Sequence, residues 1–426
     1  MRVCATYGSK VPLRAGSDMH EIRMDVFDRI PEVPNGDVVM TLCGKDANIV
    51  PTDFKGLVDV GDRIISIPHR KIRSIHDFDK TPDSDSIVSM LSEGDQEISK
   101  GAFMASSFTD LHSIMTASKN LKRRHVILGM GEIGKITRIR QSLLHNEFTF
   151  GYVGSPTAPG QLSADELERL GDDCSITGIV GCPLSHSRSP AMHNAAFRAL
   201  GMNGIYLMFE SLGIEHLRDV MIGYDIRGMN VTIPYKQSVM GQMDSLSEAA
   251  KRIGAVNTII NDDGKLKGDN TDHVGISYAF SDVDLNGKNV LIMGTGGAAR
   301  AAAYTFKNSG CDVSISGRTE HHVRVICDDF DCTQYHGSVG RFDVIVNCTP
   351  IGLVDGTYPS DINDMHSEQI VFDMVYGRDT PLIKRAKENG CRLIDGKEML
   401  IGQGAESFRL WFGKEPDHNI MREATQ

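Results

Sequence analysis

The chain has 426 residues, of which 40% are hydrophobic and 24% are charged, and its formal net charge is −11. This length and composition predict a globular protein of two or three domains, and the negative charge argues against a nucleic-acid or membrane partner. The nine cysteines form no Cys-x-x-Cys pair, and the sequence shows neither a long apolar run nor a secretory start, so we expect free thiols, no membrane span and a cytoplasmic location.

Short apolar segments follow one another through residues 1–170. Eight are expected to be strands: RVCATY (2–7), EIRMDVF (21–27), DVVMTLC (37–43), GLVDVG (56–61), KIRSIHDF (71–78), KGAFMAS (100–106), RHVILGMG (124–131) and FTFGYV (148–153). Helical segments such as 108–121 separate some of them. This alternation predicts a compact (β/α)8 barrel. Because that fold typically takes about 250 residues, several connecting helices must be short or missing.

One of these strands carries an unusual face. If MHEIRMDVF (19–27) is extended, Glu21, Arg23 and Asp25 point the same way, since side chains alternate along a strand. A solvated outer face would explain two acids and a base. A polar site inside the barrel would explain them equally, and the catalytic motifs below favour the barrel interior.

A second pattern begins after a polar junction at residues 163–175. Ser189 is expected to cap a helix with Pro190 at its first position. Between residues 285 and 395 strands and helices alternate, with strands at NVLIMG (289–294), DVSISG (312–317), FDVIVNCTP (342–350), IVFDMVY (370–376) and CRLID (391–395). This order predicts a doubly wound parallel sheet.

The first strand of that sheet leads into a glycine-rich turn. Gly294, Gly296 and Gly297, followed by Ala298, stand between the strand and a helix, where backbone N–H groups can approach a pyrophosphate. After the second strand, Ser316 and Gly317 occupy the place of the acid that NAD-binding proteins carry, and Arg318 follows. We interpret Arg318 as a ligand of a 2′-phosphate, which favours NADP. A solvated arginine near Glu320 is the alternative.

Four polar clusters precede this sheet in the sequence. They supply Ser187 and Ser189, then Asn230, Thr232 and Lys236, then Asn257 and Asp272. Hydroxyls, amides and a Lys/Asp pair suit a polyhydroxylated acid that undergoes carbonyl–alcohol exchange, with a proton moved by the protein and a hydride by a nicotinamide.

Together the motifs GCPLSHSRSPAMHN, NVTIPYK, GAVNT, GDNTD, GTGGAARA, GRT and GQGAESF resemble shikimate dehydrogenase over about residues 175–415. The resemblance implies a shikimate-binding domain of residues 175–275 plus 400–426 and a Rossmann-like NADP-binding domain of residues 276–399. It implies that Lys236 and Asp272 are catalytic. It further implies substrate binding by Ser187, Ser189, Thr232, Asn257, Tyr376 and Gln403, and cofactor binding by Gly294, Gly296, Gly297, Ala298, Arg318 and Thr319. Gly317 departs from the asparagine that is frequent in the family.

The N-terminal motifs EIRMD, SIHDF, KGAFMA, MGEIGKITR and PTAPGQ resemble type I 3-dehydroquinate dehydratase. The resemblance implies that Lys100 forms an imine with the substrate C3 carbonyl and that His76, oriented by Glu21, removes the C2 proton. Arg23, Arg138, Thr157 and Gln161 would hold the carboxylate and hydroxyls. A lysine at a strand end in a dry barrel is also expected to have a depressed pKa and to attack a ketone, and a histidine can move protons near pH 7.

One departure from the second family concerns substrate affinity. Cys43 stands where the family has an arginine, and Lys45 follows two residues later. A lysine at this place does not copy a bidentate guanidinium, because its ammonium is a point charge.

The two resemblances predict a bifunctional enzyme, which dehydrates 3-dehydroquinate to 3-dehydroshikimate and then reduces that product to shikimate with NADPH. One alternative keeps only the reductase active, with the barrel as a structural or dimerising module, and Cys43 favours it. Another is a catabolic quinate/shikimate oxidoreductase, against which Arg318 argues because such an enzyme would favour NAD. The expected partners are small molecules, not nucleic acid or membrane, and a homodimer is one option for the assembly.

Overall fold

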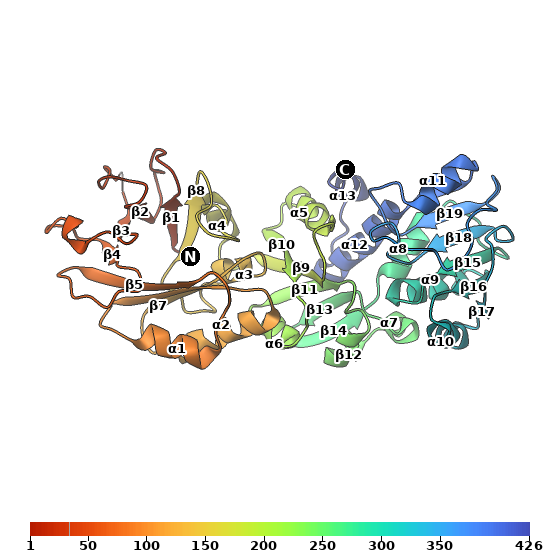
Figure 1. The fold of residues 1–426 in the computed structure, drawn as a ribbon, viewed down its shortest axis with the longest axis horizontal. Helices are drawn as coiled ribbons and strands as arrows, with labels where there is room; N and C mark the ends of the chain where they lie inside the picture. Colours follow the sequence, from red (N-terminus) through yellow and green to blue (C-terminus); the bar gives the residue numbers. More distant parts are fainter. Residues whose placement is uncertain (34) are drawn as a thin grey trace. The chain divides into compact units, whose positions relative to one another are not determined.

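The computed structural model describes residues 1–33 and 35–426 (Figure 1). Their contacts divide the chain into two compact units, Met1–Leu184 with Asn203–Arg227 and Ser185–Met202 with Gly228–Gln426. Residues 203–227 thus group with the N-terminal segment. The domain boundaries expected from the sequence, near residues 170, 275 and 400, stay a prediction.

Eight parallel strands form the sheet of the first unit, in the order β7-β6-β5-β4-β3-β2-β1-β8. They are β1 (Val3–Tyr7), β2 (Met19–Arg23), β3 (Asp37–Thr41), β4 (Leu57–Asp59), β5 (Arg70–Asp77), β6 (Ile98–Met104), β7 (His125–Met130) and β8 (Thr149–Val153). The two outer strands approach at a bridge between His125 and Asn146. There the Asn146 amide accepts from the Ile127 N–H at 2.8 Å and donates to its carbonyl at 3.0 Å. The nearly closed ring confirms the predicted barrel.

Helices join only some of the barrel strands. Among the described residues, α1 (Ser84–Ser92), α2 (Phe108–Asn120) and α3 (Lys135–Ile139) follow β5, β6 and β7, and α4 (Ala164–Leu170) follows β8. The connection after β3 holds only the short helix η1 (Ala47–Ile49). In Figure 1, α1 and α2 run along one side of the barrel. The missing early helices explain how the barrel fits a short segment, as the sequence required.

Alternation along the strands stacks two layers inside the barrel. The lower layer is apolar and is contributed by all eight strands or the residues beside them: Cys4, Met19, Val39, Leu57, Ile72, Ile98, Val126, Leu128, Phe148 and Phe150. Strand register pairs Cys4 with Met19 and Val39 with Leu57. Two residues further along six strands the same face turns polar, with Thr6, Glu21, Thr41, Asp59, Ser74 and Lys100. The packed apolar layer therefore supports a polar layer nearer the carboxyl ends of the strands, where barrel sites form.

Residues 175–270 form a mixed sheet. Within the first unit, β9 (Ser175–Gly181) pairs in parallel with β10 (Gly204–Glu210), which leads to α6 (Leu217–Gly223). β11 (Ile226–Val231) continues into the second unit, where it pairs antiparallel with β13 (Thr258–Asp262). β13 in turn pairs antiparallel with β14 (Lys265–Asp269), and β12 (Ser245–Leu246) pairs in parallel with β14. The connections between these strands also contain α5 (Ser189–Ala199), η2 (Ser238–Gln242) and α7 (Glu248–Ile253), and α8 (Asp272–Ala279) follows β14.

The second unit also holds a six-stranded parallel sheet of order β17-β16-β15-β18-β19-β20. Its strands are β15 (Asn289–Met293), β16 (Asp312–Ser316), β17 (Thr333–Gln334), β18 (Val344–Asn347), β19 (Ile370–Asp373) and β20 (Arg392–Asp395). α9 (Gly297–Asn308) and α10 (Glu320–Phe330) share a core with Val290 and Ile292 of β15, whereas α11 (Pro381–Glu388) packs with Leu291 and Met293. Helices thus cover both faces, which confirms the doubly wound sheet. The chain ends in α12 (Gly396–Phe412) and α13 (His418–Glu423).

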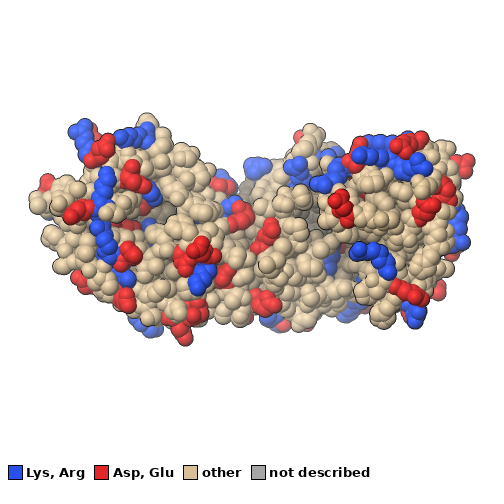
Figure 2. Space-filling model, in the orientation of Figure 1, with Lys and Arg blue, Asp and Glu red and all other residues tan. Residues whose placement is uncertain are grey.

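The surface carries both signs of charge. Figure 2 shows acidic and basic side chains interspersed over the visible face of both units. Within residues 1–33 and 35–426, none of the helices has the length and hydrophobicity that a membrane-spanning segment requires.

Candidate active sites

A cavity of about 90 Å³ opens above the polar layer of the barrel. Its wall contains every residue to which the family resemblance gave a role in this half: Glu21, Arg23, His76, Lys100, Arg138, Thr157 and Gln161. Apolar side chains, including Phe78, Leu128 and Phe150, complete the wall. The fold therefore gathers residues that are far apart in the sequence around one small space, and their roles there stay predictions.

Lys100 projects from β6 into this cavity and meets two carboxylates. Its Nζ lies 3.4 Å from Asp59 Oδ2 and 3.9 Å from Glu21 Oε1, and 4.1 Å from the centre of the Phe150 ring. Desolvation by itself lowers the pKa of Lys100, but Asp59 and then Glu21 outweigh it, so the pKa is raised above its ordinary value. The depressed pKa expected from burial is wrong, because the expectation did not include Asp59.

Asp59 is the residue that the sequence reasoning missed. It is fully buried at the end of β4, and its Oδ1 accepts hydrogen bonds from the Ser74 hydroxyl at 2.6 Å and the Gly61 N–H at 3.0 Å. These two hydrogen bonds fix the position of the carboxylate beside Lys100. The alternation that identified Glu21 would have identified Asp59 in GLVDVG as well.

Glu21 is held by hydroxyl groups. Thr6 donates to its Oε2 at 2.7 Å and Thr41 donates to its Oε1 at 2.8 Å. In the described part of the chain, His76 is not among its hydrogen-bond partners, although the charge of Glu21 acts on the histidine. The contacts therefore support Glu21 as a partner of Lys100 more directly than as an orienting group for His76.

His76 stands at the mouth of the cavity, with its ring stacked on Phe78 at 6.0 Å between ring centres. Desolvation and then the Lys100 ammonium lower the pKa of His76 to about 4. The imidazole is therefore neutral at neutral pH and has a lone pair to accept a proton.

The two arginines of the cavity differ in their burial and in their ion pairing. Arg138 is 2% exposed, its Nε has no partner among the described residues, and its Nη1 reaches only the Phe150 carbonyl at 3.4 Å. Desolvation lowers the pKa of Arg138 to about 10. Arg23 is instead paired with Asp25 at 2.7 Å. A buried guanidinium without an acid can bind an anionic group that enters the cavity.

The structure around Arg23 differs from the sequence-based expectation in the length of β2 and in the position of Asp25. β2 stops at Arg23, so the strand expected over 19–27 is shorter and Asp25 lies exposed beyond it. The Cys43 thiol hydrogen-bonds to Asp25, and desolvation together with that contact raises the pKa of Cys43 to about 11. Lys45 does not line the cavity. Arg138 and Arg23 are thus the cavity's cations besides Lys100.

Thr157 and Gln161 form one unit on the wall. The Gln161 Oε1 accepts from the Thr157 N–H at 2.8 Å and from its hydroxyl at 3.1 Å. With the oxygen used in this way, the Gln161 amide nitrogen is the group that can donate to a ligand in the cavity.

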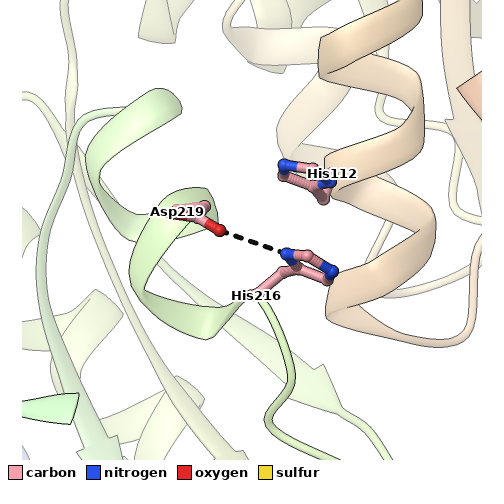
Figure 3. A group of neighbouring side chains, drawn as sticks. All are labelled: His112, His216 and Asp219. Atoms are coloured by element: carbon pink, nitrogen blue, oxygen red, sulfur yellow. Dashed lines mark hydrogen bonds and ion pairs between the residues drawn. The ribbon is translucent and has the colours of Figure 1, made fainter.

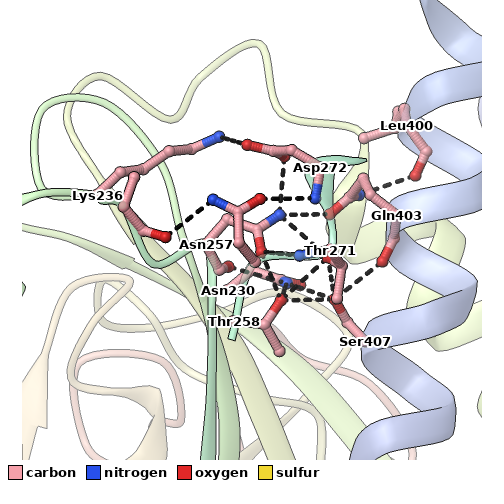
Figure 4. A network of polar contacts seen from close by, with 11 residues as sticks. Asn230, Lys236, Asn257, Thr258, Thr271, Asp272, Leu400, Gln403 and Ser407 are labelled. Carbon is pink, nitrogen blue, oxygen red and sulfur yellow. Dashed lines mark hydrogen bonds and ion pairs between the residues drawn. The ribbon is translucent and has the colours of Figure 1, made fainter. Parts of the chain in front are cut away.

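The second site lies in the second unit, where the turn after β11 faces the start of α8 (Figure 4). Lys236 Nζ is 2.5 Å from Asp272 Oδ2, and Asn257 donates to the other oxygen of Asp272 at 2.8 Å. Gln403 of α12 reaches the same Asn257 amide at 3.5 Å. Asp272 is buried, whereas Lys236 retains 15% of its side-chain exposure. The pair can therefore be reached by a substrate while its geometry is fixed from behind.

Hydroxyl groups behind this pair hold it in place. The Asn257 Oδ1 accepts from the Thr271 N–H at 2.6 Å, and the Ser407 hydroxyl lies 2.8 Å from that of Thr258 (Figure 4). Asn230, which the sequence placed among the substrate-facing groups, donates to Ser407 at 2.9 Å and is buried. Such a satisfied network supports the site. Thr258 and Ser407 lie within the motifs GAVNT and GQGAESF, but the sequence gave neither residue a role.

Ser187, Ser189 and Tyr376 meet at the start of α5. The cap position is Arg188, not Ser189 as expected, and the Ser189 N–H donates to the Ser187 hydroxyl at 3.3 Å. The Arg188 N–H donates to the Tyr376 hydroxyl, whose pKa is raised by burial. Thr232 is half-buried and its carbonyl accepts from the N–H of Tyr235 at 2.9 Å in the turn that leads to Lys236. The structure thus brings Tyr376 to the two serines across a long stretch of sequence.

The glycine-rich turn fits a dinucleotide. Gly294 has φ 128°, which favours glycine, and its Cα faces the backbone of Cys348. Gly296 occupies the cap position of α9, and an added Cβ there would meet nothing within 4 Å. Gly297 packs against Lys236, with 3.2 Å between an added Cβ and the Lys236 Cβ. Open space at a helix N-terminus suits a pyrophosphate, and Ala298 lies in the same first turn.

The residues after β16 fit the phosphate that distinguishes NADP. Arg318 is exposed and, in the described ranges, forms no ion pair, because Glu320 pairs with Arg324 at 3.3 Å instead. Thr319 takes the cap position of α10. A Cβ at Gly317 would lie 2.7 Å from Thr295 Cγ2 and 2.9 Å from Val323 Cγ2, which explains the glycine where the family often has asparagine.

Comparison with known families assigns four segments of the chain. Residues 37–172 match the model for type I 3-dehydroquinase, and residues 179–259 match that for the shikimate dehydrogenase substrate-binding domain. Residues 284–390 match the NADPH-binding domain of acetohydroxy acid isomeroreductase, and residues 396–426 match the shikimate 5′-dehydrogenase C-terminal domain.

Single proteins match the later part of the chain over nearly their whole length. The NADP(+) shikimate dehydrogenase of Archaeoglobus fulgidus is 41% identical over 262 residues, which is 58% of this chain and 96% of that protein. The enzyme of Pyrococcus furiosus is 39% identical over 263 residues, 59% of this chain and 96% of that protein. The Thermus thermophilus enzyme in complex with NADP(H) and shikimate has a TM-score of 0.55 at 33% identity, covering 59% of this chain and 98% of its own.

Proposed function

Since this chain belongs to the shikimate dehydrogenase family and also matches the type I 3-dehydroquinase model, we propose that it catalyses two successive steps of the shikimate pathway. The first half dehydrates 3-dehydroquinate to 3-dehydroshikimate, and the second half reduces 3-dehydroshikimate to shikimate. The observation that carries the proposal is the presence of two separate polar sites. One is centred on Lys100 in the barrel and the other on Lys236 and Asp272 beside a dinucleotide turn.

In the barrel, the Lys100 amine attacks the C3 carbonyl, water leaves, and an iminium forms. The positive iminium draws electrons from the neighbouring carbon, so the neutral His76 can remove the C2 proton. The C1 hydroxyl then takes this proton from His76 and leaves as water, and hydrolysis of the imine returns the amine and releases product. Asp59 and Glu21 make the neutral amine scarce, since they raise the pKa of Lys100, but the same charges stabilise the iminium, which keeps its positive charge.

The remaining polar residues of the cavity would hold the substrate. The buried Arg138 supplies a cation for the carboxylate, with Arg23 beside it, because Arg138 pairs with no acid among residues 1–33 and 35–426. The Gln161 amide nitrogen and the Thr157 hydroxyl can bind ring hydroxyls.

In the second unit the cofactor is NADP, which when bound supplies the hydride. Lys236 gives a proton to the oxygen that develops negative charge, and Asp272 positions Lys236 and accepts a hydrogen bond from the substrate hydroxyl. Gly297 lies against Lys236, which brings the proton donor next to the dinucleotide turn. Ser187, Ser189, Thr232, Asn257, Tyr376 and Gln403 would bind the substrate's carboxylate and hydroxyls.

Arg318 would bind the 2′-phosphate of the cofactor, supported by its exposure and by the pairing of Glu320 with Arg324. The free thiols of all nine cysteines favour a reducing compartment, and we propose the cytoplasm.

A coupled assay tests the proposal. Purified chain given 3-dehydroquinate and NADPH should consume NADPH and form shikimate, with 3-dehydroshikimate as the intermediate. Reduction of supplied 3-dehydroshikimate without consumption of 3-dehydroquinate would show that only the reductase half is active. Faster oxidation of quinate with NAD than of shikimate with NADP would favour the catabolic alternative. Sedimentation of the same sample distinguishes a monomer from the homodimer.

A further inference from the structure

Two histidines and an aspartate meet at the surface of the first unit, where α2 faces α6 (Figure 3). The rings of His112 and His216 stack with centres 4.1 Å apart and planes at 10°, and His216 Nδ1 lies 3.1 Å from Asp219 Oδ2. One donor atom from each of the three lies within 4.8 Å of the others. None of them lines the barrel cavity, so the reactions proposed above leave this cluster unexplained.

The packing of α2 holds His112 at this place. Its neighbour Leu111 accepts a hydrogen bond from the buried Tyr224 hydroxyl at 3.0 Å, and Phe108 stacks on Phe209 at 5.9 Å between ring centres. These contacts fix the position of α2 against the segment that carries α6. The meeting of His112 and His216 therefore follows from buried contacts and not from two freely moving side chains.

His216 has a backbone conformation that is unusual for a residue other than glycine. Its φ is 60°, in the left-handed region that residues other than glycine rarely adopt. It stands at the cap position of α6, yet its side chain makes no capping hydrogen bond and is turned toward Asp219 instead. Strain of this kind often accompanies a functional site.

A simple ion pair accounts for only part of the cluster. Asp219 can pair with a protonated His216, but a second positive imidazole stacked on the first would be repelled. Two imidazoles with lone pairs and one carboxylate are a common ligand set for zinc and similar ions.

We propose that His112, His216 and Asp219 bind one divalent transition-metal ion, of which Zn²⁺ is the best fit, with water completing the coordination. With ligand atoms about 2.0–2.1 Å from zinc, neighbouring ligands in a tetrahedron are about 3.3 Å apart. The His216–Asp219 distance of 3.1 Å is close to that spacing. A ring nitrogen of the half-buried His112 lies within 4.8 Å of the other two ligand atoms, so this side chain must move toward them to complete the set.

Such an ion would connect α2 with α6. Helix α2 lies in the segment that matches the dehydroquinase model, and α6 lies in the segment that matches the shikimate dehydrogenase model. Its role would be to stabilise the packing of α2 on α6. Neither proposed reaction depends on it, so binding can be measured apart from activity.

The test uses the full chain, freed of metal by chelation and dialysis, and titrated with Zn²⁺ by calorimetry and with Co²⁺ by visible absorption. We expect one ion per chain, a cobalt spectrum of low coordination number, and a higher unfolding temperature with Zn²⁺. His112→Ala and His216→Ala should each weaken binding at least about 10-fold, and Asp219→Asn about 10–100-fold. His336→Ala is the matched control, because His336 is an exposed histidine of the second unit.

Several results would overturn the proposal. One is wild-type binding no tighter than that of His112→Ala, and another is an equal loss of affinity in His336→Ala. His112→Gln, which keeps a polar side chain, guards against misfolding. That variant should retain both enzyme activities and lose the metal-dependent rise in unfolding temperature, and persistence of the rise would also refute the site.

Discussion

Replacing Arg138 by methionine should stabilise the protein while it damages the dehydratase. Arg138 carries a buried charge that has one long hydrogen bond and no acid in the described residues. Its neighbour Arg140 is equally buried but is fully used, since its guanidinium donates to the carbonyls of Tyr224, Asp172, Cys174 and Asp225. Substitution by methionine is therefore predicted to stabilise the protein at Arg138 and to destabilise it at Arg140.

The size of the effect follows from the pKa of Arg138. Desolvation lowers it from the ordinary value of arginine to about 10, which at about 1.4 kcal/mol per pKa unit corresponds to about 3 kcal/mol. Because the folded pKa lies below the unfolded one and this group is charged when protonated, the full cost is present at pH 7. It disappears only as the pH rises above 10 toward the ordinary pKa of arginine. After loss of some packing, we expect Arg138→Met to raise the free energy of unfolding by about 1–3 kcal/mol.

The same substitution should impair catalysis. Loss of a charged hydrogen bond to the substrate carboxylate costs about 1.5–3 kcal/mol, or about 10- to 150-fold in kcat/KM for 3-dehydroquinate. Arg140→Met should instead destabilise the protein, because each carbonyl left unpaired costs about 1–3 kcal/mol.

Calorimetric unfolding of the two variants and the parent, with dehydratase kinetics on each, measures both effects. Arg138→Lys, which keeps the charge, should not be stabilised. If Arg138→Met lowers the unfolding temperature as Arg140→Met does, the guanidinium of Arg138 is balanced by its surroundings and the argument for an anion site fails.

Four further predictions concern the chemistry. Borohydride added with 3-dehydroquinate should label Lys100, and His76→Ala should still form the adduct but turn over about 10²–10⁴-fold more slowly; labelling that survives Lys100→Ala would exclude this lysine. The rate of imine formation should rise with pH, since the carboxylates raise the pKa of Lys100, and Asp59→Asn should move the rise to lower pH; an unmoved profile would remove Asp59 from the argument. Arg318→Ala should lower the NADP preference over NAD about 10- to 150-fold, as loss of a charged hydrogen bond implies, and an unchanged ratio would place the phosphate elsewhere. Lys236→Ala should accumulate 3-dehydroshikimate from 3-dehydroquinate while Lys100→Ala still reduces supplied 3-dehydroshikimate; loss of both activities in either variant would contradict independent sites.

Local alternation predicted most of the fold. Apolar runs located the barrel strands and the doubly wound sheet, and the glycine turn located the start of α9. The sequence could not show how strongly each group is buried or which charges meet, so it gave Lys100 a depressed pKa where the neighbouring Asp59 raises it. The approach of His112 to His216 depends on packing between distant segments, and no local pattern encodes it.

The supports behind Lys236 and Asp272 show the same limit. The motifs predict which residues face a substrate, but within those motifs Thr258 and Ser407 are ordinary hydroxyl residues. Their role becomes visible only when α12 lies beside β13 and their hydroxyls come within 2.8 Å. Residues that hold a site in place are thus harder to predict than residues that act in it.

The packing of α2 and Arg140 also limits which substitutions this protein can accept during evolution. Arg140 lies before the expected boundary near residue 170, whereas the carbonyls that it binds lie beyond that boundary, at Cys174 and at Tyr224. Helix α2 likewise shares buried contacts with residues 209 and 224. A barrel cut from the chain after residue 172 would expose these buried contacts of α2 and Arg140 to solvent. Substitutions in residues 203–227 are therefore constrained by the stability of the barrel as well as by the reductase. At these residues, neither activity can change independently of the other.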